Sequence, residues 1–418
     1  MLTPPRMLLA VTTLVAVVVV PGLAEGGGPA QAAPPQARAS QQALSPLIFG
    51  HRGAPGYRPE HTLASYDLAV RLGADVIEPD VVSTKDGVLV VRHENEISGT
   101  TDVAKHPEFA SRRTTKRIDG TELTGWFTED FTLADLRTLR AVERLPDIRQ
   151  ENTLYDGRYQ VPTLQEVLDL ATLESRLTGR HIGIAPETKH PTYFDSIGLS
   201  LEEPLLRLLD RAGLNRPGTG VYVQSFEEAN LRDLRRLGLR TQVVQLTSAG
   251  PTARPYDHVA SGDPETYAQM TTFPGLREVR TYASWLGPDI TQILPRDASG
   301  TQLAPTRLVA DAHRARLGVV PYTFRAENVF LPAQYRRGTN PTDFGDELSF
   351  LQDAFAAGVD GLFADQSDIA FAAREDLYGF GAGIQHPQAA VVAPPPARDA
   401  ARQRSRVLQS DPAPALAG

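Results

Sequence analysis

The chain has 418 residues, of which 41% are hydrophobic and 22% charged, so it is long enough for one large domain or two ordinary ones and too apolar to be disordered throughout. Its formal net charge of -8 and the lack of a block rich in lysine and arginine argue against nucleic acid as a partner. Because the chain contains no cysteine, disulfides and a lipid anchor on an N-terminal cysteine are excluded.

Residues 1–32 have the three parts of a secretory signal peptide. Arg6 precedes an uncharged run over residues 7–20, and small residues suitable for cleavage follow, with sites after Ala24 or Ala32. The run is short for a membrane span, which needs roughly 20 residues, so an uncleaved anchor is the weaker alternative. We therefore expect a secreted, extracellular protein without a stable membrane anchor.

Two segments flanking the centre of the chain have compositions typical of disorder. Residues 33–45 are rich in proline, alanine and glutamine, and residues 381–418 in alanine, proline and arginine. Neither segment can bury enough apolar surface to become ordered. We expect a disordered linker, a folded region over residues 46–380 and a disordered tail.

Within the folded region, short apolar runs alternate with amphipathic segments. The runs that predict strands are residues 47–49, 76–82, 88–91, 181–185, 221–223, 242–246, 317–322 and 361–364. Apolar residues recur at intervals of three and four, as in a helix, over residues 62–72, 164–173, 202–212 and 226–237. Alternation of this kind predicts an α/β fold with a parallel sheet.

Polar residues at strand ends favour a barrel over an open sheet. Six of them lie at or just past the carboxyl ends of predicted strands: His51, Glu78, His93, Glu187, Gln224 and Asp365. A barrel gathers those ends at one mouth, whereas an open doubly wound sheet usually carries a glycine-rich phosphate loop, which does not follow the first strand here. We predict a TIM-type (β/α)8 barrel.

Two segments depart from eight regular units. A turn signal at residues 85–87 leaves no room for a helix between its neighbouring strands, so these form a hairpin or an irregular unit. Residues 101–159 are polar and long for a barrel connection. We expect them to form an inserted lobe over the mouth, after the strand that ends at His93; a surface excursion without function is the alternative.

Two histidines at strand ends, His51 and His93, are the candidates for proton transfer. Cleavage of a phosphodiester needs a proton taken from the attacking oxygen and a proton given to the leaving oxygen, and histidine suits both because its pKa lies near neutrality. His181, His190 and His258 lack comparable neighbours in the sequence. We expect these three to be surface or packing residues.

Three carboxylates, Glu78, Asp80 and Glu187, are the candidate metal ligands. Residues two apart on a strand point to the same face, so Glu78 and Asp80 can hold one cation between them. Their apolar neighbours argue against simple surface solvation, since a buried carboxylate needs a cation or paired donors; Glu187 has weaker local support. Oxygen ligands suit calcium or magnesium rather than zinc.

Arg52 and Lys189 are the candidates for binding the phosphoryl oxygens. The first offers a planar fork of donors and the second a point charge. An arginine beside a catalytic histidine can also serve only as a partner for Glu60, and the residues alone leave both interpretations open.

The folded region closely resembles the glycerophosphodiester phosphodiesterases, and in particular their exported, periplasmic type. The N-terminal signature of that family is similar to residues 51–94, which read HRGAPGYRPEHTLASYDLAVRLGADVIEPDVVSTKDGVLVVRHE. The likeness continues in order through TDV at 101–103, FTLADLRTL at 131–139, PTLQEVL at 162–168, IGIAPETKHP at 182–191, YVQSF at 222–226, GPDI at 287–290, PYTFRAEN at 321–328 and DGLFADQSDIA at 360–370.

This resemblance implies a TIM-type barrel that hydrolyses a small glycerophosphodiester to glycerol 3-phosphate and an alcohol. The family's site residues fall on seven positions: His51 and His93 as the acid/base pair, Arg52 and Lys189 as phosphate contacts, and Glu78, Asp80 and Glu187 as ligands of a divalent metal. Calcium is usual in the exported group, and magnesium is the alternative.

Three positions depart from the broad family pattern. The usual His-Asp pair is His93-Glu94 here, which leaves a supporting role for Glu94 open. His61 stands where many relatives have asparagine, a substitution associated with the exported group. Tyr322 stands where tryptophan is frequent, and with Arg325 nearby the alcohol or glycerol pocket is expected to be reshaped.

Other functions on the same barrel stay open from sequence. One is hydrolysis of a glycerol-phosphate polymer such as teichoic acid, another is a phospholipase activity, and a third is a binding protein that has lost activity. Intact candidate site residues argue against the last. The shape of the mouth separates the others, because a polymer needs an open groove, a lipid an apolar rim and a small diester a closed pocket.

Overall fold

The structure is a computed structural model and describes residues 45–379. The predicted signal peptide and tail, and all of the predicted linker except Ser45, lie outside these residues and stay predictions. Within residues 45–379, no helix combines the length and the hydropathy that a bilayer crossing requires.

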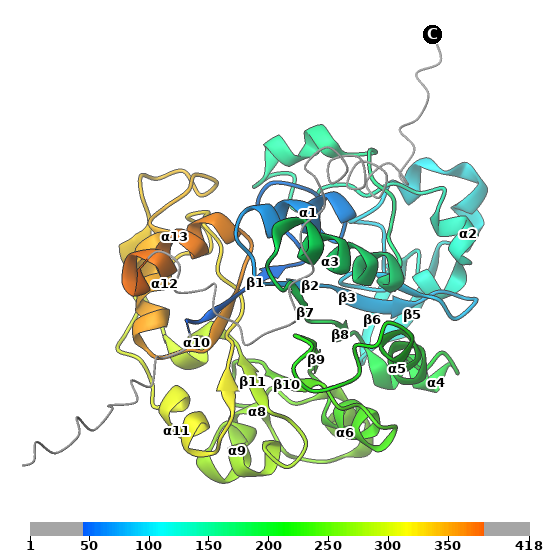
Figure 1. The fold of residues 1–418 in the computed structure, drawn as a ribbon. Helices are drawn as coiled ribbons and strands as arrows, with labels where there is room; N and C mark the ends of the chain where they lie inside the picture. Colours follow the sequence, from blue (N-terminus) through cyan, green and yellow to red (C-terminus); the bar gives the residue numbers. More distant parts are fainter. Residues whose placement is uncertain (1–44, 380–418) are drawn as a thin grey trace, which may run out of the picture. The chain divides into compact units, whose positions relative to one another are not determined.

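The strands form two sheets and a separate hairpin (Figure 1). In the first sheet the order is β13 (Gly361–Ala364), β1 (Leu47–His51), β2 (Val76–Glu78) and β7 (Gly183–Ile184). In the second it is β12 (Gly318–Val319), β11 (Trp285–Pro288), β10 (Gln242–Thr247), β9 (Tyr222–Ser225), β8 (Glu187–Thr188), β3 (Asp80–Ser83) and β4 (Leu89–Val91). All pairs in the two sheets are parallel except β3 with β4, which form the hairpin that the turn signal predicted.

Proline separates neighbouring strands at two places, and at the first of them, Pro79, it divides the strand that the sequence predicts over residues 76–82. Pro79 separates β2 from β3, and Pro186 separates β7 from β8. Proline cannot donate a ladder hydrogen bond, but the carbonyl of Pro79 still accepts from the Glu187 N–H at 2.9 Å. The chain therefore changes from one sheet to the other at these points.

Single bridges link the edge strands of the first sheet, β7 and β13, to segments next to strands of the second sheet. Ile184 pairs with Val221, beside β9, and Phe324 pairs with Ala364, at the end of β13. The predicted α/β class is confirmed. One continuous eight-stranded sheet is not seen among the described residues, because the ladder is broken where the sheets meet.

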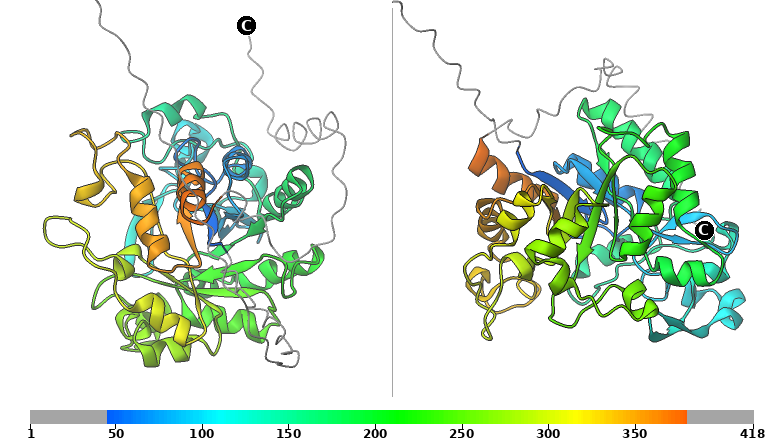
Figure 2. Two further views of the ribbon diagram at one scale, coloured as in Figure 1. Left: turned by 60° about the vertical axis from the view of Figure 1, so that its left-hand side comes forward. Right: turned by 90° about the horizontal axis from the view of Figure 1, so that it is seen from below.

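Helices lie on the outside of the strands, as two further views also show (Figure 2). The longer helices are α1 (Leu63–Arg71), α3 (Leu164–Thr178), α5 (Glu202–Arg211), α6 (Glu228–Arg236), α12 (Glu347–Ala356) and α13 (Ser367–Tyr378). The shorter ones are α4 (Pro191–Ser196), α7 (Tyr256–Ser261), α8 (Tyr267–Met270), α9 (Phe273–Val279), α10 (Ile290–Ile293) and α11 (Leu308–Arg314). Helix α3 begins at a capping box between Thr163 and Glu166 and ends at Gly179, whose φ is 69°.

Residues 101–159, which we call the lobe, contain a hairpin and short helical turns. Its elements are β5 (Thr114–Ile118), β6 (Thr121–Gly125), α2 (Leu133–Leu136) and the 3-10 turns η1 (Val103–Lys105), η2 (Pro107–Arg112), η3 (Thr128–Asp130) and η4 (Gln150–Tyr155). Phe109 and Phe131 of the lobe are buried in the main hydrophobic core. The lobe is therefore packed onto the strands and helices rather than projecting from them.

Candidate active site

Every second residue of a strand faces the same side of the sheet. In several strands the row of apolar residues on one side continues at the carboxyl end with a polar residue. In β1, Leu47 and Phe49 belong to a small apolar cluster, and His51 continues their row. Phe363 of β13 belongs to the same cluster, and Asp365 follows two residues later. The same step of two leads from Val76 to Glu78, from Ala185 to Glu187 and from Tyr222 to Gln224.

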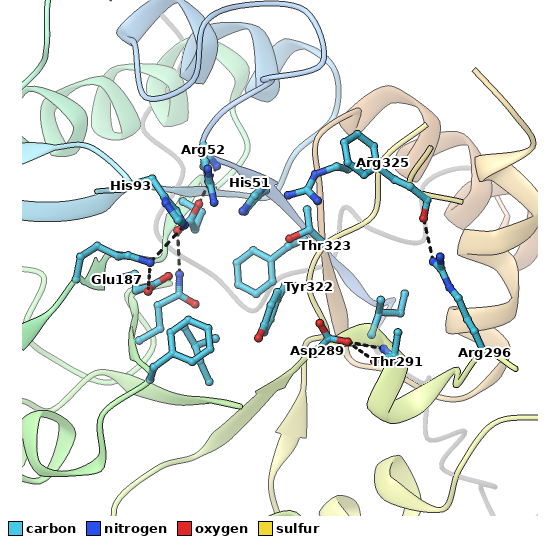
Figure 3. Close-up of a pocket in the computed structure, with 18 residues that line it drawn as sticks. His51, Arg52, His93, Glu187, Asp289, Thr291, Arg296, Tyr322, Thr323 and Arg325 are labelled. Carbon is cyan, nitrogen blue, oxygen red and sulfur yellow. Dashed lines mark hydrogen bonds and ion pairs between the residues drawn. The ribbon is translucent and has the colours of Figure 1, made fainter. Parts of the chain in front are cut away.

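At the carboxyl ends of these strands lies a cavity of about 310 Å³ (Figure 3). Six of the seven predicted site residues line it: His51, His93, Arg52, Lys189, Glu78 and Glu187. The seventh, Asp80, is fully buried, and its carboxylate lies within 4.8 Å of those of Glu78 and Glu187. The structure thus brings all seven residues together.

His51 is held by a carboxylate from the opposite end of the chain. Its Nδ1 lies 2.6 Å from Oδ1 of Asp365, the residue after β13. Burial, reinforced by the Arg52 guanidinium, lowers the pKa of His51 to about 4. The imidazole is neutral at neutral pH, with Nδ1–H donating to Asp365 and Nε2 left to accept a proton.

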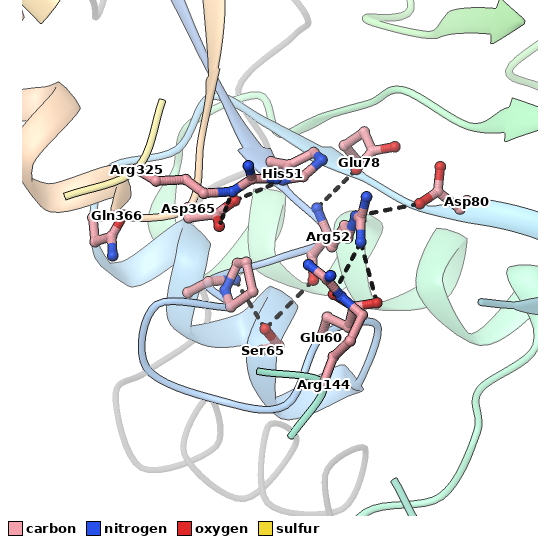
Figure 4. Close-up of polar contacts among 12 residues, drawn as sticks. His51, Arg52, Glu60, Ser65, Glu78, Asp80, Arg144, Arg325, Asp365 and Gln366 are labelled. Carbon is pink, nitrogen blue, oxygen red and sulfur yellow. Dashed lines mark hydrogen bonds and ion pairs between the residues drawn. The ribbon is translucent and has the colours of Figure 1, made fainter. Parts of the chain in front are cut away.

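Asp365 is itself paired with two arginines. Arg325 donates to its Oδ2 at 3.0 Å (Figure 4), and Arg149 donates to the same oxygen at 2.6 Å. Although burial alone would raise it, these guanidiniums hold the pKa of Asp365 well below its usual range. The carboxylate that orients His51 therefore stays charged.

His93, just past β4, has a carboxylate on one nitrogen and a cation near the other. Its Nδ1 lies 2.8 Å from Glu94, and its Nε2 lies 3.4 Å from Nζ of Lys189. Burial, followed by the charges of Arg52 and Lys189, lowers the pKa of His93 to about 3. Lys189 also donates to Glu187 at 2.8 Å, so one ammonium joins the histidine to the acidic cluster.

The expectation that His190 is a surface or packing residue is wrong. Its Nε2 lies 2.8 Å from Glu94 and its Nδ1 2.5 Å from Asp119, at the tip of the β5–β6 hairpin. Burial opposes protonation, but these two hydrogen bonds raise the pKa of His190 to about 9. Its partners are 96 and 71 positions away, so no local pattern could reveal them.

The three candidate metal ligands crowd together in a buried place. Glu78 ends β2, Asp80 begins β3 and Glu187 begins β8, on either side of the strand breaks. Burial, followed by repulsion from neighbouring carboxylates, raises the pKa of Glu78 well above its usual range. Burial also raises the pKa of Glu187 to about 8.

This donor set fits a hard divalent cation. All three residues offer oxygen, which calcium and magnesium prefer. Among residues 45–379, Oδ1 of Asp80 is buried and has no hydrogen-bond partner. A buried carboxylate oxygen without a donor is stabilised by a cation, so the residues present match the metal that the resemblance implies.

His61 holds Asp80 in place, a role that its sequence context did not reveal. Its Nε2 lies 2.8 Å from Oδ2 of Asp80, and its Nδ1 lies 2.7 Å from the Tyr66 hydroxyl. The imidazole is fully buried. The departure from asparagine at this position was the one available signal.

Arg52 pairs with Glu60, as one interpretation of the sequence expected, and also lines the cavity. It donates to Glu60 at 3.0 Å, and Arg144 of the lobe donates to the same carboxylate at 2.7 Å. It also lines the cavity, with its Nε 3.6 Å from Asp80. Pairing with Glu60 fixes the guanidinium at the edge of the cavity, where an anion can reach it.

A tight turn sets the position of Arg52. Gly53 has a φ of 96°, and a Cβ there would lie 2.6 Å from Oγ of Ser65 in α1. The same hydroxyl accepts a hydrogen bond from the Ala54 N–H at 2.9 Å. Only glycine fits this close approach, which explains the glycine after His51-Arg52.

The chain resembles known enzymes in sequence. A family model described as the glycerophosphoryl diester phosphodiesterase family matches residues 51–369. A glycerophosphodiester phosphodiesterase of Arabidopsis thaliana is 33% identical over 353 residues, which cover 78% of this chain and 84% of that protein. One of Haemophilus influenzae is 28% identical over 347 residues, covering 79% of this chain and 90% of that protein.

The fold is similar to that of solved structures. A protein of Silicibacter pomeroyi with a provisional assignment as a glycerophosphoryl diester phosphodiesterase matches with a TM-score of 0.56 at 21% identity, covering 80% of this chain and 95% of that one. A phosphodiesterase of Oleispira antarctica, solved with its product sn-glycerol 3-phosphate, matches with a TM-score of 0.51 at 19% identity, covering 78% and 96%. At these identities the likeness concerns the fold alone.

Proposed function

The chain belongs to the glycerophosphoryl diester phosphodiesterase family and hydrolyses a glycerophosphodiester to glycerol 3-phosphate, and we propose that His51 and His93 transfer the protons of this reaction beside a divalent cation. One observation carries the proposal. The two histidines, two cationic side chains and an acidic cluster converge at one cavity from five separate strands or strand ends.

Each histidine is prepared for proton transfer in the same way. His51 has Nδ1 on Asp365 and His93 has Nδ1 on Glu94, which fixes the tautomer and the ring orientation. In each case Nε2 is the nitrogen that faces the reacting oxygens; that of His93 also lies 3.4 Å from Nζ of Lys189. One histidine takes a proton from the attacking oxygen, and the other gives one to the leaving oxygen of the alcohol.

Arg52 and Lys189 bind the phosphoryl oxygens in this proposal. Both line the cavity, and both contribute to the low pKa of His93. A phosphate anion between them offsets their charge, so substrate binding raises the affinity of His93 for a proton at the moment when one is needed.

Glu78, Asp80 and Glu187 would hold the divalent cation, which when bound supplies positive charge to the phosphoryl oxygens. Calcium is the ion that the family resemblance favours, and magnesium suits the same oxygen donors. The chain's own contribution is to keep the three carboxylates apart from bulk water and to hold Asp80 through His61.

The size of the cavity supports a small diester as the substrate. About 310 Å³ is at the lower end of the range for small-molecule sites. Its lining includes apolar side chains as well as polar ones, among them Phe226, Tyr322 and Phe330. A glycerol-phosphate polymer would need a longer groove, and a phospholipase an apolar rim.

Fold closure and export belong to the same proposal. The bridges from Ile184 to Val221 and from Phe324 to Ala364 support two sheets that are arcs of one TIM-type barrel. Residues 1–32, with the pattern of a signal peptide, support secretion.

The test is release of glycerol 3-phosphate from glycerophosphocholine, glycerophosphoethanolamine and a glycerol-phosphate polymer, with and without chelator. We expect turnover of the two small diesters, loss of that turnover in chelator and recovery with calcium. Unchanged turnover in excess chelator would remove the cation from the proposal, and faster turnover of the polymer would replace the small substrate.

A further inference from the structure

Each of the two histidines is the inner end of a chain of polar contacts that finishes in the lobe. The His51 arm consists of His51, Asp365 and Arg149, and the His93 arm of His93, Glu94, His190 and Asp119. Arg149 and Asp119 both come from residues 101–159, but from different parts of that segment.

The His51 arm is buried throughout. Arg149 is 4% exposed and Asp365 1%. The guanidinium donates through Nη2 to Asp365 at 2.6 Å and through Nε to Glu327 at 2.5 Å. Because Arg149 bridges two carboxylates, its position is fixed. By donating to Oδ2 it orients the Asp365 carboxylate, whose Oδ1 contacts His51.

The His93 arm alternates imidazole and carboxylate. The distances are 2.8 Å from His93 to Glu94, 2.8 Å from Glu94 to His190 and 2.5 Å from His190 to Asp119. Glu94 uses one oxygen for each histidine, Oε1 for His93 and Oε2 for His190. A side chain that would otherwise rotate freely is held at both ends.

Neither Arg149 nor Asp119 lines the cavity. They therefore cannot act on the substrate there by direct contact. What they can set is the angle and the tautomer of the imidazole two or three contacts away, and partners of this outer kind typically change activity by about 10- to 100-fold when removed.

We propose that Arg149 and Asp119 are positioning residues, through which the lobe holds both proton-transferring histidines in their working orientation. The inference rests on the proposed roles of His51 and His93. It gives the lobe a part in the chemical step in addition to its place in the core.

Two variants test it with little change of shape. Asp119→Asn removes a charge at a position whose φ of 45° asparagine tolerates. Arg149→Lys keeps the charge but lacks the planar fork that spans Glu327 and Asp365. We expect each to lower kcat about tenfold or more while KM changes by less than about twofold. Glu122→Gln in the same hairpin and Arg158→Ala at the other end of the lobe, both exposed, should match the wild type.

A double-variant comparison separates positioning from general damage. If Asp119 acts through His93, then Asp119→Asn should lower kcat no further in a His93→Ala background, and Arg149→Lys should behave in the same way with His51→Ala. Equal losses in both backgrounds, or a wild-type kcat in the single variants, would overturn the inference. The proposed function fails separately, if His51→Ala and His93→Ala themselves keep wild-type turnover.

Discussion

The two arms of the site reach the same end by different means. In the His51 arm a carboxylate that is 1% exposed is paired with arginines, whose charge does not change at any ordinary pH. In the His93 arm the carboxylate of Glu94 is 41% exposed and is paired with His190, which titrates. We therefore expect the contact that orients His93 to depend on the protonation of His190, whereas the arginines beside Asp365 do not titrate.

The largest effect should come from removing either histidine. We expect His51→Ala and His93→Ala each to lose about 10²-fold or more in kcat, because each removes one proton-transfer group. Release of glycerol 3-phosphate measures the loss, and thermal melting checks that the variants are folded. Near-native rates in either variant would contradict its assignment.

A nitrophenyl ester of glycerol phosphate, used as the substrate, shows which of the two histidines is the general acid and which is the base. Nitrophenolate leaves without a proton, so the variant of the general acid should recover much of its rate with this substrate, whereas the variant of the base should not. Equal recovery in both variants would show that the two arms do not divide the work into acid and base.

The second-largest effect should come from the cluster of Glu78, Asp80 and Glu187, which lies beside both histidines. His61→Ala removes the imidazole that holds Asp80, and we expect it to weaken calcium binding by about 10- to 100-fold. Titration calorimetry gives the affinity directly, without relying on turnover. His61→Asn, which keeps one donor, is the matched control and should lose less; no change in affinity for the alanine variant would deny His61 this role.

The pH dependence of stability should distinguish the arms with a smaller effect. The pKa of His190 is raised from 6.5 to about 9, so its contribution is complete below 6.5 and is lost as pH rises through 9. The pKa of His51 is lowered to about 4, so stability falls as pH drops from 6.5 through 4. Thermal melting at a series of pH values measures this. The Tm of His190→Gln should change less with pH than that of the wild type on the alkaline side, and the Tm of His51→Gln should change less on the acid side.

The smallest effect should be a change in thermal stability on replacement of Glu347, which interacts with Asp365 of the His51 arm. Glu347 is 1% exposed, and among the described residues neither of its carboxylate oxygens has a hydrogen-bond partner. Burial, followed by Asp365 and Glu327, raises its pKa well above the usual range, so it weakens the fold as pH rises. Glu347→Gln should melt a few degrees higher than wild type at neutral pH and show no gain at acid pH; an equal gain at both would exclude a titration effect.

The sequence predicted the inner members of the site because they follow local rules. His51, Glu78 and Glu187 end or begin short apolar runs, and a step of two places them on one face with Phe49, Val76 and Ala185. Their convergence therefore needed only the parallel sheet.

The outer members could not be predicted in this way. Arg149 is 216 positions from Asp365, and its own surroundings in the sequence are ordinary. His190 was misassigned for the same reason. The apolar runs predict the class of the fold but not its details. Pro79 breaks the predicted strand over residues 76–82, and β8 and β11 lie outside the runs that predict strands.

Those two prolines have a consequence for the choice of ion. One stands between Glu78 and Asp80 and the other immediately before Glu187, and the ring of proline fixes one torsion of the main chain beside every ligand. A rigid backbone keeps the spacing of the carboxylate ligands the same whichever ion is bound, and a site of fixed size selects ions by their radius. We expect any selectivity of the site between calcium and the smaller magnesium to reside in the backbone beside these two prolines as much as in the carboxylates.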